Sequence, residues 1–433
     1  MANGMRWIRF AALTLVLAVN GFRCNPTETD AEVGNDQLEE VYAWKALDYA
    51  WPSQASKDRA IARGDYIPKN NAMVGVKIWG DRAYVAVPRW LPGVPATLNW
   101  FPAAAGEDVK GPLSTPLTPY PCWEMQEVGN CSAIQFVQSM EIDPLGRMWV
   151  LDVGRRNFFT PTPDNSCPPK LVLLDLNEDG RVLRTFVFPD EVASHTRSFL
   201  NDLVIDVSGG GNGSDWYAYI SDAMGDPASG GGGIVVYHLG SDRAWRVADS
   251  ASMNVDPAAS EAIVGGRRSK LRANVDGIAL TSLSEGADKV FYAPLGSFNL
   301  YTLPTSLLRD PPADPTEISS SVIDLGRRIS QGDGMAVDST GALYFGLLAK
   351  DGFARWTHEA QVGNGDPSEA EIVAQDSVRL QWVDSFGFDS PNKSLFVVSN
   401  RLQNLQLDDV NLDEINYRLF RIKINARSYM YPD

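Results

Sequence analysis

The chain has 433 residues, of which 44% are hydrophobic, and its formal net charge at pH 7 is −16. This length suffices for one large closed β unit or for two to three ordinary domains. A negative field repels phosphate groups, so the composition argues against a nucleic-acid or anionic-membrane partner and favours cationic ligands.

The first 23 residues have the pattern of a secretory signal peptide. Arg6 and Arg9 form a basic region, and the apolar stretch FAALTLVLAV that follows them is too short to span a bilayer. We expect cleavage near residue 23, an N-terminal extension over residues 24–40, and a secreted, extracellular protein without a membrane segment.

A secretory route makes disulfides the expected state of the cysteines. Pairing of Cys122 with Cys131 would close a short loop, and Cys167 would then join Cys24 or stay free, so the sequence leaves the pairing open. The absence of a C-x-x-C pair and of clustered histidines argues against a zinc site. Glycosylation is expected at the three Asn-X-Ser sequons, which begin at Asn130, Asn212 and Asn392.

The region from residue 70 to 425 is built from short apolar runs separated by Gly, Pro, Asn and Asp, a pattern typical of β-strands; one helical turn is expected over 305–308. Six copies of one strand recur at spacings of 51 to 75 residues, each followed by an aromatic-rich second strand: VGVKIW, QSMEID, NDLVID, DGIALT, DGMAVD and DSFGFD. This spacing fits the four-stranded blades of a propeller. We therefore predict an all-β protein, a six-bladed β-propeller with a central channel over residues 41–425, followed by a tail over 426–433. Two separate β domains are the alternative.

Closure of the propeller requires one blade to be shared between the two ends of the repeat region. The last strand, NYRLFRIKI over residues 416–424, lies far from any seventh copy. We expect it to complete a blade together with the segment after residue 40, which would hide both strand edges.

The first residue of each copy should lie near one mouth of the channel, because the innermost strand of a blade faces it. These residues are Val74, Gln138, Asn201, Asp276, Asp333 and Asp384. In one interpretation the Asp and Asn side chains only cap turns through their own backbone. In the other, the convergent carboxylates attract a metal ion or a protonated amine, and aromatic residues such as Trp90, Phe158 and Phe159 stack on the ligand.

Several separate motifs resemble the yellow and major royal jelly protein family. They are the segment 49–100, which begins YAWPSQASKDRAIARGDYIP, then RMWVLDVGR, CPPKLVLLDL, and LQWVDSFGFD with LFVVSNRLQ, collinear over roughly residues 40–425. The resemblance implies a secreted six-bladed propeller. It also implies functions that vary within the family: pigmentation factors, a dopachrome-converting activity, nutritive proteins, and salivary proteins that capture biogenic amines.

The amine-binding members of that family suggest site residues in the last blade. The resemblance implies that the Ser385 backbone carbonyl and the Asn400 side chain accept hydrogen bonds from the amine. Leu402 stands where an aromatic residue stacks on the ligand ring, which removes the stacking geometry. Leu145 stands where many members carry a cysteine, so the family's usual disulfide pairing does not transfer directly.

Three functions compete, and the residues favour a binding protein over an enzyme. The first is binding of a small cationic or aromatic ligand, a biogenic amine or a catechol-derived compound, with Asp276, Asp333 or Asp384 supplying charge and no cofactor required. The second is a dopachrome-type isomerase with Asp333 and His195 as catalytic candidates. The third rests on FLNDLVID and NVDGIAL, which are similar to the metal-binding blades of senescence marker and gluconolactonase propellers; it implies a calcium-dependent lactonase-like hydrolase with Asn201 and Asp276 as ligands. The oligomeric state stays open.

Overall fold

The computed structural model describes residues 37–103, 114–211, 213–225, 231–357 and 365–432. The chain divides into two compact units, Met1–Glu32 and Val33–Asp433, and the described residues all belong to the second. The predicted signal peptide, Cys24 and the sequon at Asn212 lie outside the described residues. Within the described ranges, no helix combines the length and apolar character needed to cross a membrane.

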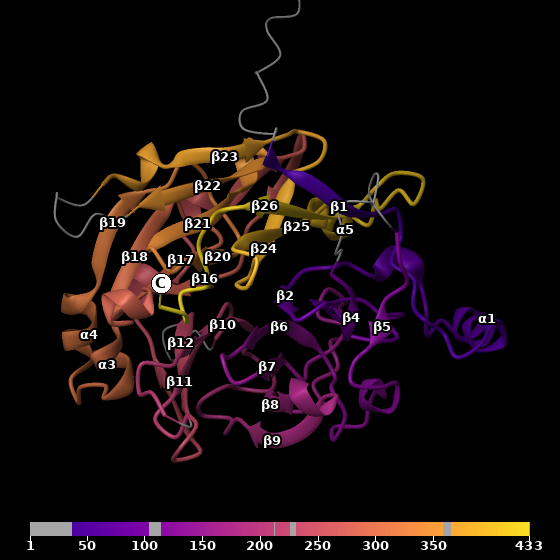
Figure 1. Cartoon of the computed structure of the whole chain (residues 1–433), viewed down its shortest axis with the longest axis horizontal. Helices are drawn as coiled ribbons and strands as arrows, with labels where there is room; N and C mark the ends of the chain where they lie inside the picture. Colours follow the sequence, from indigo (N-terminus) through magenta and orange to yellow (C-terminus); the bar gives the residue numbers. More distant parts are fainter. Residues whose placement is uncertain (1–36, 104–113, 212, 226–230, 358–364, 433) are drawn as a thin grey trace, which may run out of the picture. The chain divides into compact units, whose positions relative to one another are not determined.

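Six antiparallel sheets of four strands each surround a central axis, which confirms the predicted six-bladed β-propeller (Figure 1). The inner strand of each blade is the predicted repeat strand, and the aromatic-rich strand lies next to it. Blade 1 contains β2 (Val76–Trp79), β3 (Arg82–Ala86), β4 (Leu98–Pro102) and β5 (Thr118–Pro119). Blade 2 contains β6 (Val137–Ile142), β7 (Arg147–Asp152), β8 (Lys170–Asp175) and β9 (Arg181–Val187). Blade 3 contains β10 (Leu200–Asp206), β11 (Tyr217–Asp222), β12 (Gly233–His238) and β13 (Arg243–Val247).

The remaining blades follow the same order from the axis outward. Blade 4 contains β16 (Val275–Leu280), β17 (Lys289–Pro294), β18 (Asn299–Pro304) and β19 (Ile323–Arg327). Blade 5 contains β20 (Met335–Val337), β21 (Ala342–Leu347), β22 (Gly352–Thr357) and β23 (Glu371–Gln375). Blade 6 contains β24 (Trp382–Asp389), β25 (Ser394–Asn400), β26 (Tyr417–Lys423) and β1 (Glu39–Trp44).

Blade 6 is therefore built from both ends of the chain, as predicted. β1 pairs antiparallel with β26, from Glu39 opposite Arg421 to Trp44 opposite Tyr417. An ion pair of 2.6 Å joins Glu39 to Arg421 at the outer end of this pairing. The N-terminal strand thus covers an edge of β26 that would otherwise expose unpaired backbone groups.

The other elements lie outside the blades. A two-stranded hairpin, β14 (Glu261–Val264) with β15 (Arg267–Lys270), precedes blade 4. The α-helices are α1 (Gln54–Arg63), α2 (Ser250–Met253), α3 (Thr305–Arg309), α4 (Pro315–Ser321) and α5 (Leu402–Gln406). Single 3-10 turns occupy Pro68–Asn70, Glu124–Gln126, Leu176–Glu178, Pro257–Ala259, Leu283–Glu285, Leu348–Lys350 and Pro367–Glu369. The predicted turn over 305–308 is α3.

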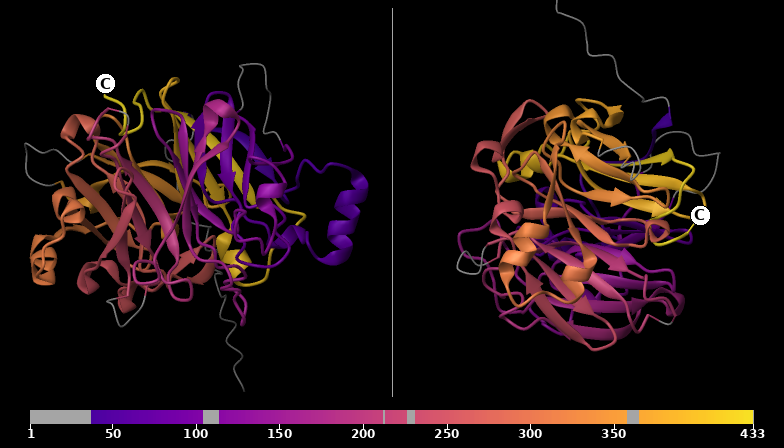
Figure 2. Two further views of the ribbon diagram at one scale, coloured as in Figure 1. Left: turned by 90° about the horizontal axis from the view of Figure 1, so that it is seen from below. Right: turned by 90° about the vertical axis from the view of Figure 1, so that its left-hand side faces the viewer.

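Helix α1 was not predicted, and it projects from the side of the propeller (Figure 2). The Ser53 side chain caps its first turn by accepting from the Ser56 amide, and Gly64 ends it in the left-handed conformation at φ 75°. Only Ala60 is buried in it, so the helix has almost no apolar stripe that a periodicity search would detect.

Burial decreases from the axis outward. Every residue of β16 and β21 is buried, whereas the outermost strand β9 is exposed along nearly its whole length. Inner and second strands carry apolar side chains on both faces because each is covered by the neighbouring blades, and this packing holds the inner strands in place around the channel.

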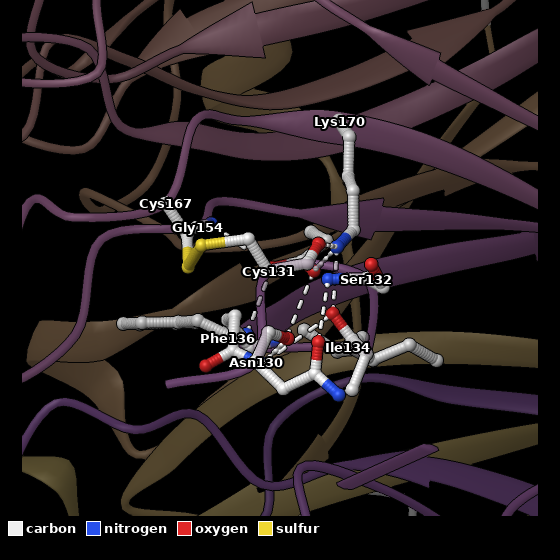
Figure 3. Close-up of polar contacts among 12 residues, drawn as sticks. Asn130, Cys131, Ser132, Ile134, Phe136, Gly154, Cys167 and Lys170 are labelled. Atoms are coloured by element: carbon white, nitrogen blue, oxygen red, sulfur yellow. Dashed lines mark hydrogen bonds and ion pairs between the residues drawn. A yellow bond between two sulfur atoms is a disulfide. The ribbon is translucent and has the colours of Figure 1, made fainter. Parts of the chain in front are cut away.

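One disulfide fixes the loop before blade 2. Cys131 is bonded to Cys167, so the pairing of Cys122 with Cys131 is wrong; Cys122 is exposed and has no disulfide partner among the described residues. The buried Lys170 ammonium donates to the Cys131 and Ala133 carbonyls at 2.5 and 2.6 Å, as Figure 3 shows for the surrounding loop. These two backbone carbonyls lie outside the sheets, so the lysine side chain supplies their hydrogen-bond donor. The loop is therefore stabilised by side-chain hydrogen bonds rather than by strand pairing.

The described sequon asparagines are both exposed. Asn130, in the loop of Figure 3, donates to the Glu127 carboxylate at 2.9 Å, and Asn392 donates to Asp389 at 2.8 Å. Their exposure is compatible with the predicted glycosylation, which stays a prediction.

The residues after blade 6 pack against the ends of several inner strands. Tyr429 is 4% exposed, and its hydroxyl accepts from the Ile205 amide of β10 at 2.8 Å. Its backbone amide donates to Val337 of β20, and its carbonyl accepts from the Leu283 amide after β16. The Ser428 amide donates to Ser390 Oγ after β24. Residues 427–431, named here the C-terminal segment, thus bond to blades 3, 4, 5 and 6.

Candidate functional site

A cavity of about 480 Å³ lies at the end of the channel where the repeat strands begin. It is named here the channel-mouth cavity. Five of the six predicted ring residues line it, namely Gln138, Asn201, Asp276, Asp333 and Asp384. Val74, the sixth, is 1% exposed and is not among the lining residues. The ring predicted from the repeat is thus brought together around one cavity.

β-Bulges in the inner strands explain how these side chains reach the cavity. The register between inner and second strands shifts in four blades, at Val137/Ser139, Leu200/Leu203, Val275/Gly277 and Val383/Ser385. The ring residues of these blades, Gln138, Asn201, Asp276 and Asp384, fall within the shifts. A bulge leaves its extra residue outside the ladder and re-aims the side chain, here toward the channel mouth.

The second residue of a repeat copy, which directly follows the ring residue, is small where neighbouring inner strands approach closely. A Cβ atom on Gly277 would lie 2.5 Å from the Asp333 carbonyl oxygen, and one on Gly334 would overlap the Asp384 carbonyl oxygen. The Ser385 hydroxyl joins blade 6 to blade 1 by donating to the Val74 carbonyl at 2.6 Å. Gly277, Gly334 and Ser385 therefore pack against the backbone of the next blade rather than against the cavity.

The three ring carboxylates differ in their hydrogen-bond partners. Asp333 accepts from the Trp382 indole nitrogen at 2.7 Å, and Asp384 accepts from the Asn400 amide at 2.8 Å. Asp276 is 4% exposed, and its Oδ1 atom has no hydrogen-bond partner among the described residues. A buried carboxylate oxygen without a donor is costly, so this atom marks a position that a ligand donor would satisfy.

A second unsatisfied acceptor lies on the same cavity. The Gln138 Oε1 atom is buried and has no partner within the described ranges, and Gln138 lines the cavity with Asp276. When Asp276 is ionised, both atoms can only accept, so together they select a ligand with hydrogen-bond donors, such as an ammonium group.

Burial and mutual repulsion raise the proton affinity of the three carboxylates. Burial first, and then the charges of Asp333 and Asp384, raise the pKa of Asp276 well above its ordinary value. Burial and the charge of Asp333 raise the pKa of Asp384, against the hydrogen bond from Asn400. Burial raises the pKa of Asp333 to about 7, although the hydrogen bond from Trp382 opposes the rise. Near neutral pH the cluster therefore holds protons that a bound cation would displace.

One buried guanidinium acts on this cluster. Arg328 is 2% exposed and donates to the Ser297 carbonyl at 2.9 Å. Its positive charge acts to lower the pKa of Asp276, while burial lowers its own pKa to about 10. Arg328 therefore favours ionisation at Asp276, which is also the carboxylate with a free acceptor atom.

Aromatic side chains form one wall of the cavity. Trp90 and Phe159 stack with ring centroids 5.3 Å apart, and Phe158 lies against Phe199 at 4.8 Å. These rings offer a flat apolar surface and negative ring faces to a ligand ring or cation. Phe199 was not singled out from the sequence, although it precedes the repeat strand of blade 3 by two residues.

The residues suggested by the amine-binding relatives are only partly at the cavity. Leu402 lines it, and its amide donates to Asn400 Oδ1 at 3.0 Å. The Asn400 amide group donates to Asp384 and to the Met73 carbonyl, so Asn400 positions Asp384. Ser385 is not a lining residue, and its hydroxyl joins blades 6 and 1.

The catalytic and metal candidates are not all at the cavity. His195 is exposed, bonds Asp190 at 2.6 Å and lies away from the cavity lining, so it does not join Asp333. Asn201 and Asp276 both line the cavity. However, among the described residues no group of three or more His, Cys, Asp or Glu side chains is arranged to hold a metal ion. The cavity can supply negative charge and acceptor oxygens, and Asn201 and Asp276 stay predicted ligands.

Capping and cavity roles are divided within one repeat copy. In blade 5, Asp338 accepts from the amides of Thr340 and Ala342, so this residue caps the turn after its strand. Asp333, at the start of the same copy, lines the cavity and bonds to Trp382 of the next blade. The turn-capping interpretation therefore describes the last residue of the copy, not the first.

A second cavity, of about 590 Å³, lies at the opposite ends of the inner strands, beside Trp79, Ile142 and Tyr431. Its buried charges, Lys77 and Glu141, already pair with each other at 2.9 Å. None of its lining residues has a buried polar atom without a partner. The channel-mouth cavity is therefore the stronger candidate for a ligand site.

Comparisons with known proteins agree on a family and not on an activity. The family model described as "Major royal jelly protein" matches residues 135–430. "Protein yellow" of Drosophila erecta and that of Drosophila melanogaster are each 30% identical over 388 residues, which covers 89% of this chain and 68% of each relative. Among solved structures, a luciferin-regenerating enzyme has a TM-score of 0.47 at 12% identity, covering 90% of this chain and 96% of that one. A gluconolactonase from Xanthomonas campestris has a TM-score of 0.42 at 12% identity, covering 93% and 99%. At these scores the two structures carry no functional argument.

Proposed function

The chain belongs to the yellow and major royal jelly protein family, and from this membership we propose that it is a binding protein that takes up a small aromatic ligand with a positive charge in the channel-mouth cavity. The observation that carries the proposal is the unsatisfied Asp276 carboxylate oxygen, which lines an aromatic-walled cavity with Asp333 and Asp384. The ligand class is a biogenic amine or a catechol-derived amine.

The size and chemistry of the cavity support this ligand class. A volume of about 480 Å³ suits a compound with one or two rings. The aromatic wall would stack on the ring, and the ammonium would donate to Asp276 Oδ1 and Gln138 Oε1. Three neighbouring carboxylates are stabilised by a cation that neutralises their repulsion.

We extend the proposal to the setting of the protein. The basic and apolar pattern of residues 1–23 supports secretion, and family membership supports a role in pigmentation in which the ligand derives from a catechol. No observation favours the isomerase or the lactonase over binding.

Isothermal titration calorimetry with serotonin, dopamine and octopamine tests the binding proposal. We expect at least one amine to bind, and its affinity to increase as the pH rises through about 7, because the Asp333 carboxyl group, with a pKa of about 7, loses its proton there. Asp276→Asn keeps the shape of the side chain and removes its charge, so it should weaken binding by roughly tenfold or more.

Asp310→Asn is the matched control, since it makes the same charge change at an exposed position outside the cavity. It should leave the affinity unchanged. The proposal fails if none of the three amines produces heat, or if Asp310→Asn weakens binding as much as Asp276→Asn.

A further inference from the structure

Two positively charged side chains that line the channel-mouth cavity have no polar partner among the residues that the structure describes. Lys270, the last residue of β15, and Arg272 both line the cavity and are both exposed. Neither side chain has an ion pair or hydrogen bond with another residue in the described part of the chain. In a chain with a net charge of −16, unpaired cations beside an acidic cluster need an explanation.

The hairpin that carries Lys270 pairs its other cations. Arg267 forms an ion pair with Asp409 at 2.5 Å, and Arg268 forms one with Glu261 at 2.6 Å. Only the two cations on the cavity lack such partners among the described residues of this segment, 267–272. The cations without such partners are therefore the two that line the cavity, whereas the two elsewhere on the hairpin form ion pairs.

The segment from Lys270 to Asp276 runs from the outside of the cavity to its interior. Lys270 and Arg272 are exposed, whereas Asp276 is 4% exposed. Arg272 and Asp276 are four positions apart in the sequence, so their Cα atoms are at most about 14 Å apart. Long Lys and Arg side chains shorten this gap for a ligand, so one small molecule can reach both charge types.

We propose that the ligand of this cavity is zwitterionic, an aromatic amino acid whose ammonium group meets Asp276 and whose carboxylate meets Lys270 and Arg272. This inference rests on the proposed function and specifies its ligand. A simple amine would satisfy the inner carboxylates and leave the two outer cations facing its positive charge. An anionic group on the same ligand removes that repulsion and accepts charge-assisted hydrogen bonds from Lys270 and Arg272.

The test compares ligands that differ only in the carboxylate. Titration calorimetry with 5-hydroxytryptophan against serotonin, and with 3,4-dihydroxyphenylalanine against dopamine, keeps each ring and ammonium constant. We expect the amino acid of each pair to bind roughly three- to tenfold more tightly than its amine. The methyl ester of 5-hydroxytryptophan, which retains the ammonium and lacks the carboxylate charge, should bind like serotonin.

The double variant Lys270→Gln with Arg272→Gln should change the affinities of the two ligand types differently. It should weaken binding of the amino acids to the level of the amines, while the amines bind equally or slightly more tightly because a like-charge repulsion is lost. The matched control, Arg267→Gln with Arg268→Gln, changes the same charge on the same hairpin away from the cavity and should preserve the difference.

Each outcome decides the inference. If the amines bind more tightly than the amino acids or equally well, the zwitterionic ligand is wrong and the proposed function stands. If the double variant weakens both ligand types equally, Lys270 and Arg272 shape the cavity and do not read a carboxylate, which also overturns the inference. If neither amine nor amino acid binds, the proposed function fails as well.

Discussion

At the scale of single residues, three aspartates of the same repeat position differ in how they are held. Trp382 holds Asp333, Asn400 holds Asp384, and Asp276 has a free oxygen among the described residues. Such a cluster is costly when empty and ionised, because the charges repel and lie in a poorly solvated place. Retaining the three carboxylates in the fold therefore costs stability.

This cost predicts a pH-dependent gain from removing one charge. The pKa of Asp333 in the folded protein is about 7, above the ordinary value of an aspartate, so the folded state binds more protons than the unfolded state between these values. The stability contributed by this group is therefore complete at acidic pH and is lost as the pH rises through about 7. Asp333→Asn keeps an acceptor for Trp382 and should be more stable than the parent near pH 8 by roughly 1–3 kcal/mol, with little difference near pH 4.

Thermal unfolding midpoints across this pH range measure the effect. Asp310→Asn, on the exposed surface, should show no comparable pH-dependent gain. A gain for Asp333→Asn that is larger near pH 4 than near pH 8 would contradict a raised pKa at this position.

At the scale of elements, the bulged inner strand is the unit that builds the site. Its first residue is placed outside the ladder, and its second residue is small where the next blade approaches. Gly75 and Gly334 occupy the same position in blades 1 and 5, and they have different surroundings. A Cβ atom on Gly75 would meet its nearest neighbour at 3.4 Å, an ordinary contact, whereas one on Gly334 would overlap the Asp384 carbonyl.

Gly334→Ala should therefore be much more destabilising than Gly75→Ala. We expect Gly334→Ala to cost roughly 2–4 kcal/mol or to prevent folding, because backbone atoms of two blades would have to separate, and Gly75→Ala to change stability by less than about 1 kcal/mol. Equilibrium unfolding in urea, with circular dichroism to verify the β content of each variant, compares the two. Equal losses of unfolding free energy for both substitutions would show that the close approach of the blades does not determine the need for glycine at position 334.

The sequence predicted the inner strands well because the repeat itself encodes them. Its six copies identified all six blades, the shared blade and five lining residues of the cavity, including Gln138 and Asn201. Lys270 and Arg272 were missed because they lie at and just after the end of the hairpin β14–β15, which is not part of the sequence repeat. The structural roles of Ser385 and Asn400 could not be predicted from the sequence, because their bonds to the Val74 and Met73 carbonyls depend on blade 6 meeting blade 1 in space.

At the scale of the whole molecule, contacts beyond neighbouring blades converge on the C-terminal segment. Tyr429 contributes bonds to Ile205, Leu283 and Val337, in or beside blades 3, 4 and 5. A single buried residue thus links three blades, through its hydroxyl to blade 3 and through its backbone to blades 4 and 5.

Tyr429→Ala should lower the free energy of unfolding of the entire propeller by roughly 3–5 kcal/mol, since a large buried side chain and its cavity contacts are lost. Tyr429→Phe isolates the hydroxyl and should cost only about 1–2 kcal/mol, from the Ile205 amide that loses its acceptor. Tyr431→Ala, two residues along and partly exposed, is the control. Calorimetric unfolding distinguishes them, and identical midpoints for Tyr429→Ala and Tyr431→Ala would contradict the linking role.

The pairing of β1 with β26 also has a consequence during protein synthesis. β1 leaves the ribosome before any other strand of the propeller, yet its partner is made last, after all the other strands. An incomplete nascent chain must therefore carry an open blade edge, which is a template for association with other chains. Only a chain that has been synthesised through β26 can cover that edge, so prematurely terminated chains keep it exposed.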